Sequence, residues 1–87
     1  MSWTVEFDKH SLKQLQKLDK AVVRQILDYM EEISKLEDPF TRSSGLSGNL
    51  AGLWRYRVGD YRVICDIQAK VVTIFVIEVG HRSEVYD

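Results

Sequence analysis

Apolar and polar positions along the chain predict one strand, then two helices, then three strands. Residues 3–7 alternate between apolar and polar side chains, which is typical of a half-buried strand. Two runs of apolar residues at helical spacing follow Asp8 and Asp19, and both aspartates are suited to cap a helix. The second helix is expected to end at the segment EDPF, residues 37–40, because proline cannot continue a helix.

The second half of the chain predicts a sheet. Residues 41–54 are glycine-rich and without apolar periodicity, so we expect a long loop that is functional or mobile. Strands are predicted at about 53–58, about 61–67 and about 71–79, and the almost continuously apolar last strand should be central and covered on both faces. This order predicts one α+β domain over residues 1–87: an N-terminal strand, a helical hairpin, then a mainly antiparallel sheet with the helices on one face.

The turn between the first two of these strands predicts which side chains share a face. Gly59-Asp60 is a two-residue hairpin loop with glycine first, as a type II′ turn prefers. The resulting register places Arg57 opposite Arg62 and puts Arg55 on the same face. Arginines directly opposite each other destabilise a sheet unless something compensates. One interpretation is a solvated face with nearby carboxylates as partners, but three guanidinium groups together favour a phosphate site.

Composition and charge limit the classes of function. The formal net charge is −1, which gives no overall attraction to nucleic acid, but five of the six basic residues in 42–87 are arginines. Cys65 is the only cysteine, which excludes an internal disulfide, and it is expected in the core. Together with the distant His10 and His81 it does not make a zinc site, so we expect no metal and no cofactor. No leader or membrane segment is evident, so a cytoplasmic protein is expected.

Polar side chains follow the last strand, in the segment GHRSEVYD. His81, Arg82, Glu84 and Tyr86 are expected to come out near one end of the arginine face if this strand lies beside residues 61–67. Arginines with a histidine and a tyrosine suit the cleavage of a phosphodiester. A base would take the proton of a ribose 2′-hydroxyl, guanidinium groups would stabilise the phosphorane, and an acid would protonate the leaving oxygen.

The segments LWRYRVGDYRVICDI and VVTIFVIEVGHRSEVYD resemble the RelE family of bacterial toxins, within the RelE/ParE superfamily. The resemblance extends over nearly the whole chain and implies a RelE-like fold. It further implies a ribosome-dependent endoribonuclease toxin, or mRNA interferase, that inhibits translation by cutting mRNA in the ribosomal decoding site. The cleavage would be metal-independent, by attack of the 2′-hydroxyl, and would leave a 2′,3′-cyclic phosphate and a 5′-hydroxyl. The implied partners are a cognate RelB-like antitoxin, the ribosome and mRNA.

The resemblance also implies roles for phosphate-binding residues. Arg62, in DYRV, matches an arginine that binds the transition-state phosphate, and Arg82 matches the arginine that follows the last strand. Arg55 and Arg57 lie where the best-known members carry lysines. An arginine there keeps the charge for binding RNA phosphates but is poorly suited to giving up a proton.

Two residues compete for the proton transfer. Tyr86 matches the tyrosine of the terminal EVY, a proposed general base, and would need its pKa lowered by neighbouring arginines. His81 stands where related toxins use a histidine as acid or base, or it is an exposed loop residue.

Two other functions remain open. One is a ParE-like inhibitor of DNA gyrase with the same fold, and the other is a catalytically weakened homologue that acts through antitoxin binding.

Overall fold

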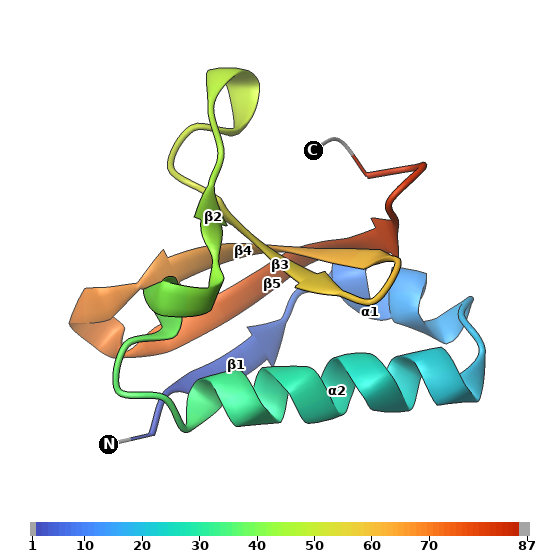
Figure 1. The fold of residues 1–87 in the computed structure, drawn as a ribbon, viewed down its shortest axis with the longest axis horizontal. Coiled ribbons are helices and arrows are strands. Elements are labelled where there is room, and N and C mark those ends of the chain that lie inside the picture. The colour runs from blue at the N-terminus through green and yellow to red at the C-terminus, as the bar shows by residue number, and fades with distance from the viewer. Residues whose placement is uncertain (1, 86–87) are drawn as a thin grey trace.

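Two helices cover one face of a five-stranded sheet in the computed structural model of the protein, which describes residues 2–85 (Figure 1). The elements in chain order are β1 (Thr4–Phe7), α1 (Lys9–Gln16), α2 (Lys20–Ser34), the 3-10 helix η1 (Pro39–Arg42), β2 (Ser44–Gly45), the 3-10 helix η2 (Gly48–Leu50), β3 (Trp54–Val58), β4 (Tyr61–Gln68), the 3-10 helix η3 (Ala69–Val71) and β5 (Thr73–His81). The strand order is β1-β5-β4-β3-β2. β1 runs parallel to β5, and the other neighbouring pairs are antiparallel. The predicted α+β class with both helices on one face is confirmed.

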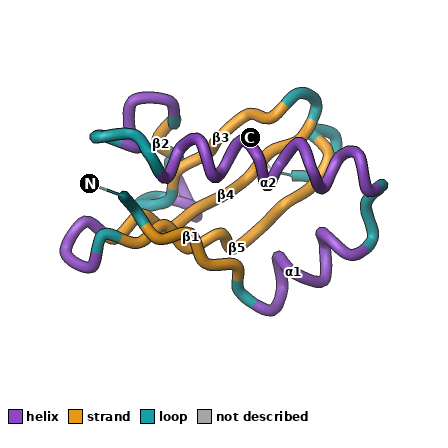
Figure 2. The backbone as a smooth tube through the Cα atoms, turned by 90° about the horizontal axis from the view of Figure 1, so that it is seen from below, coloured by secondary structure: helices purple, strands orange, loops and turns teal. Residues whose placement is uncertain are grey.

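The start of α1 is tied to the centre of the sheet. Asp8 caps this helix, since its Oδ1 accepts the Ser11 N–H at 2.8 Å. The Ser11 hydroxyl is fully buried and donates to the backbone oxygen of Val76 in β5 at 2.9 Å. The Asp19 cap of α2 makes no side-chain hydrogen bond. The helices run in roughly opposite directions but splay apart, and each packs on the sheet (Figure 2).

The prediction that EDPF ends α2 is wrong. The helix ends at Ser34, and the backbone N–H of Trp3 donates a hydrogen bond to the Ser34 carbonyl oxygen at 2.7 Å. Pro39 instead opens η1, with Asp38 as its cap. Because the bond from Trp3 reaches the helix end from the other end of the chain, local propensity did not reveal it.

The main hydrophobic core lies between the helices and the sheet. Its fully buried members include Ile26, Met30 and Ile33 of α2 and Tyr56, Val63, Cys65, Ile74 and Val76 of the sheet. The predicted covering of β5 on both faces is wrong, because Phe75 and Ile77 point away from the helices and are only half-buried. A mixed sheet with helices on one side needs only one apolar face, and the other face is left for the arginines of β3 and β4.

Two segments rise from the face that the helices leave open (Figure 1). The predicted loop forms one of them, an arm of residues 44–53, which begins with the short strand β2 paired to β3. The second is a tail of residues 82–85 that follows β5 at the opposite end of the sheet. β2 adds a strand to the four predicted, and a two-residue strand with one glycine carries too little periodicity to be predicted.

One side chain completes the sheet where β1 ends. β1 pairs with residues 73–76 of β5, and the rest of β5 continues without a strand on that side. Gln14 of α1 occupies the place of the missing strand, since its Oε1 accepts a hydrogen bond from the Val79 N–H at 2.6 Å.

Neither helix described here is both long and apolar enough to cross a membrane.

We predict that Gln14→Ala lowers the free energy of unfolding by about 1–3 kcal/mol, because it removes the acceptor of a half-buried N–H. Gln16→Ala is the matched control, since Gln16 is exposed on the same helix. Urea denaturation measures both changes. Equal effects of the two substitutions would show that the bond to Val79 does not hold the end of β5.

Candidate functional site

The β3–β4 hairpin has the predicted register. Val58 lies opposite Tyr61, Arg57 opposite Arg62, and the pairing continues to Trp54 and Cys65. Gly59 has a φ of 59°, whereas Asp60 does not have a positive φ, which is the pattern of a type II′ turn.

The arginine face therefore exists as predicted and consists of Arg55, Arg57 and Arg62. The three side chains differ in burial: Arg57 is exposed, Arg55 is half-buried, and Arg62 has only 7% of its surface exposed. Ile64 lies directly opposite Arg55 on the same face, with 2% exposed. This face thus carries one buried apolar side chain among arginines at different depths.

The buried arginine is held by the hairpin turn. Nη1 of Arg62 donates to the Gly59 carbonyl oxygen at 3.2 Å and to the Tyr61 carbonyl oxygen at 3.0 Å. Neutral carbonyl oxygens satisfy a guanidinium but bind it less strongly than an anion does. A phosphate at Arg62 would add a charged acceptor to these contacts.

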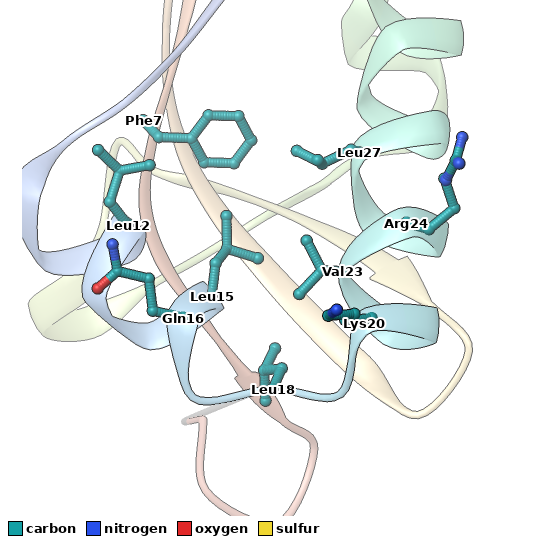
Figure 3. A pocket seen from close by; sticks show the side chains of 9 residues that line it. All are labelled: Phe7, Leu12, Leu15, Gln16, Leu18, Lys20, Val23, Arg24 and Leu27. Atoms are coloured by element: carbon teal, nitrogen blue, oxygen red, sulfur yellow. The ribbon is translucent and has the colours of Figure 1, made fainter.

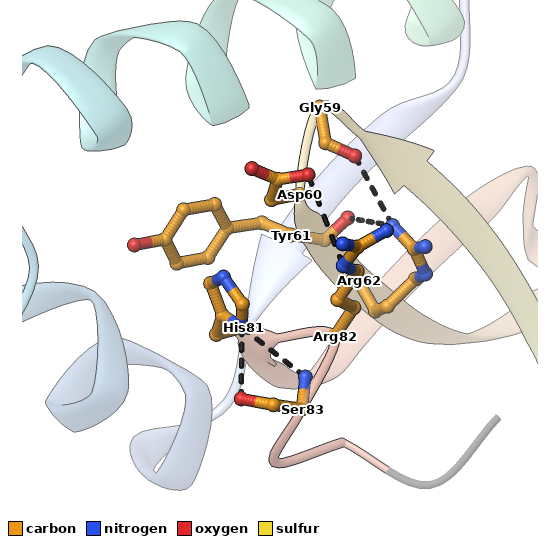
Figure 4. Close-up of polar contacts among 7 residues, drawn as sticks. All are labelled: Gly59, Asp60, Tyr61, Arg62, His81, Arg82 and Ser83. Carbon is orange, nitrogen blue, oxygen red and sulfur yellow. Dashed lines mark hydrogen bonds and ion pairs between the residues drawn. The ribbon is translucent and has the colours of Figure 1, made fainter.

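The same turn holds Arg82 (Figure 4). The Arg82 N–H donates to the Asp60 carbonyl oxygen at 2.8 Å, and Nε lies 3.9 Å from Asp60 Oδ1 in an exposed ion pair. Arg82 and Arg62 are therefore bound to the same turn. Asp60 is a site residue that the sequence did not single out as one, since an aspartate in a turn is common for conformational reasons alone.

His81 does not join the arginines. It lies opposite Tyr61 in the β4–β5 pairing, whereas Arg62 lies opposite Gly80, so His81 and Arg62 project from opposite faces of the sheet. The His81 ring packs edge-on against Tyr61 with the centroids 5.4 Å apart, on the other side of the strand from the arginines (Figure 4). The expectation that His81 comes out beside the arginine face is wrong. Tyr86 lies outside the described residues.

Hydrogen bonds define the state of the His81 ring. The backbone N–H of Ser83 donates to Nδ1 at 3.2 Å, and the Ser83 hydroxyl lies 2.9 Å from the same atom. Because a backbone N–H can only donate, Nδ1 is an acceptor and the neutral ring carries its proton on Nε2.

Two other titratable side chains near the hairpin belong to the core. Burial raises the pKa of the Cys65 thiol far above its usual range, so Cys65 is a core residue, as predicted, and no thiolate nucleophile. Burial likewise raises the pKa of Tyr56, whose hydroxyl donates to the Pro39 carbonyl oxygen at 2.6 Å. Within residues 2–85 no three histidine, cysteine or acidic side chains gather as metal ligands.

An apolar groove of about 490 Å³ lies between α1 and α2 (Figure 3). It is lined by Phe7, Leu12, Leu15, Gln16, Leu18, Lys20, Val23, Arg24 and Leu27. Lys20 and Arg24 are exposed, and the remaining lining contains no acid or base. The groove offers apolar contact but no group for proton transfer, so the arginine face is the better candidate for a site of catalysis.

Comparison with known proteins identifies the class. Residues 5–86 match the family described as the ParE toxin of the type II toxin–antitoxin system parDE. The mRNA interferase toxin RelE of Escherichia coli is 31% identical over 99% of this chain and 92% of its own length. Toxin RelG of Mycobacterium tuberculosis is 26% identical over 99% of this chain and 98% of its own.

Solved structures agree with these relatives. The RelBE2 toxin–antitoxin complex of Mycobacterium tuberculosis contains a chain that is 25% identical, with a TM-score of 0.86 over 94% of this chain and 100% of that one. The archaeal RelE–RelB complex of Pyrococcus horikoshii contains one that is 30% identical, with a TM-score of 0.74 over 98% and 100%. The chain belongs to the RelE/ParE superfamily of toxins of toxin–antitoxin systems.

We predict that Arg57→Gln raises the free energy of unfolding by about 0.2–1 kcal/mol, because it removes a like charge directly opposite Arg62. Arg24→Gln on α2 is the control, since Arg24 is also exposed but lies off the arginine face. Urea denaturation at low salt measures both. A loss of stability in Arg57→Gln would show that Arg57 contributes more through its own contacts than it costs by repulsion.

Proposed function

We propose that this toxin is a ribosome-dependent endoribonuclease that cleaves mRNA in the decoding site and thereby inhibits translation. The observation that carries the proposal is the convergence of Arg62 and Arg82 on one hairpin turn, beside Arg55 and Arg57. Inhibition of an enzyme by binding alone gives no reason to hold two arginines at one point. The relative named an mRNA interferase, at 31% identity, supports the same reading.

The reaction would be a transesterification without a metal ion. The 2′-oxygen of a ribose attacks the adjacent phosphorus while its proton passes to a base, and the bond from phosphorus to the 5′-oxygen breaks. An acid protonates that 5′-oxygen, which leaves a 2′,3′-cyclic phosphate and a 5′-hydroxyl. Arg62 and Arg82 would stabilise the charge of the phosphorane, and Arg55 and Arg57 would bind neighbouring phosphates.

Arg62 is suited to this role by its present contacts. Its Nη1 is already aimed by two carbonyl oxygens of the turn, so the guanidinium loses little freedom when it binds the substrate. Its burial excludes water, which strengthens its interaction with a developing charge.

For the proton transfer we infer Tyr86 rather than His81 as the base. His81 projects from the face opposite Arg62, and its Nδ1 already accepts from Ser83. Tyr86 follows Val85 in the chain, and Val85 lies on the arginine side of the sheet, over Gly80. Arginines near a phenol favour its ionised form.

The partners would be the ribosome, mRNA and a cognate RelB-like antitoxin in the cytoplasm. Two of the solved relatives are toxin–antitoxin complexes, RelBE2 and RelE–RelB. A second candidate function is inhibition of DNA gyrase, favoured by the match of residues 5–86 to the ParE toxin family.

We predict that expression of the wild-type chain arrests growth, with cuts at codon-defined positions in translated mRNA, and that Arg62→Ala abolishes both. The reason is the loss of the buried guanidinium that stabilises the phosphorane. Primer extension on a translated message measures the cuts, and Arg24→Ala serves as the control because it removes an arginine of the helix face. Growth arrest with gyrase-dependent DNA breaks and no mRNA cuts would replace the nuclease by the gyrase inhibitor.

We predict that Tyr86→Phe lowers kcat for mRNA cleavage about 10²- to 10⁴-fold, as the loss of a general base does. His81→Ala should lower it by less than about tenfold, because His81 faces away from Arg62. Single-turnover cleavage on programmed ribosomes measures both rates. The reverse order would assign the proton transfer to His81 and require its ring to cross to the arginine side.

A further inference from the structure

The tail is held by three backbone hydrogen bonds. Arg82 N–H donates to Asp60 of the hairpin turn at 2.8 Å, and the Glu84 and Val85 N–H groups donate to the His81 carbonyl oxygen at 2.8 and 3.1 Å. These bonds fold the tail back on the end of β5. They define the backbone path of the tail as far as Val85, but they do not involve any side chain.

One side chain anchors the far end of the tail. Val85 has only 5% of its surface exposed, although it does not belong to the core between helices and sheet. A Cβ at Gly80 would lie 2.7 Å from Val85 Cγ2, so Val85 packs directly on the backbone of Gly80. No other residue type at position 80 would leave room for this contact.

Gly80 is the strand partner of Arg62. The two residues lie directly opposite each other in the β4–β5 pairing, so Val85 sits on the arginine side of the sheet at the position beside Arg62. Arg82, three residues before Val85, is bound at the same time to Asp60 of the turn that holds Arg62.

We propose that Val85 is a positioning residue: its contact with Gly80 fixes the tail on the arginine face, and so holds Arg82 in place beside Arg62. This inference rests on the proposed function. The bonds from Glu84 and Val85 to His81 join the tail only to the end of β5, whereas the side-chain contact between Val85 and Gly80 holds the tail against the face of the sheet. Displacement by about 1 Å of groups that act on one phosphate lowers the rate of a reaction by up to about 10².

Two single substitutions and their combination test the contact. Val85→Ala removes the methyl groups that pack on Gly80, and Gly80→Ala places a Cβ where Val85 Cγ2 lies. Gly80 does not have a positive φ, so alanine fits its backbone. We expect each single change to lower kcat about 10- to 100-fold with KM nearly unchanged, since Arg55 and Arg57 still bind the RNA.

The double variant gives the decisive result. In Gly80→Ala/Val85→Ala the new Cβ occupies space that the valine methyls have left, so kcat should recover toward the wild-type value. Val71→Ala is the matched control, since Val71 is 62% exposed at the opposite end of β5 and should leave kcat unchanged. A double variant as slow as the product of the two single losses would overturn the proposal, because independent defects multiply.

Amide hydrogen exchange separates this inference from the proposed function. In both single variants the Arg82, Glu84 and Val85 amides should exchange faster, and in the double variant they should be protected again. Unchanged exchange in both singles would overturn the anchoring by Val85, and faster exchange with unchanged kcat would overturn its positioning role. A wild-type chain that cleaves no mRNA would overturn the proposed nuclease, while the exchange rates still decide whether Val85 anchors the tail.

Discussion

The two-residue turn at Gly59-Asp60 is the constraint on which the site depends. Its length and the positive φ of Gly59 set the β3–β4 register, and that register decides which face each arginine occupies. A slip by one residue would turn Arg62 toward the helices and expose the apolar side chains of the hairpin. The turn also supplies the oxygens that hold Arg62 and Arg82, so one local conformation both sorts the side chains and aims two of them.

Repulsion between like charges on the arginine face lowers the stability of the fold. Arg57 and Arg62 lie opposite each other, and Arg82 arrives at the same turn. The carbonyl oxygens of the turn and the Asp60 carboxylate offset part of the repulsion, and only Asp60 carries a full negative charge. Asp66 of β4 and Glu78, the strand partner of Ile64, lie further along the same face. Like charges directly opposite each other lower the stability of a hairpin, so this arrangement of arginines does not follow from the needs of folding alone.

Sequence reasoning predicted the fold class, the hairpin register and the arginine face, because each follows from local patterns: helical spacing, strand alternation and a turn whose length permits one register. It did not predict the end of α2, the strand β2, or the face that His81 occupies. The Ser34 carbonyl oxygen accepts a hydrogen bond from the Trp3 N–H, and the Val79 N–H donates one to the Gln14 side chain. Both bonds join distant parts of the chain. Side-chain patterns do not contain that information, since they describe neighbours along the chain only.

The position of His81 shows the same limit in its sharpest form. The β4–β5 pairing shifts at Ile64 and Cys65, where one residue of β5 is left over, and beyond this bulge Tyr61 lies opposite His81 and Arg62 opposite Gly80. A bulge exchanges the faces of the residues that follow it relative to an unbroken strand. The exchange turns the imidazole away from the arginines and puts glycine, the one residue without a side chain, beside Arg62. The space that opens there is the space that Val85 fills. The loss of one candidate from the site and the docking of the tail are therefore two consequences of a single extra residue in β5.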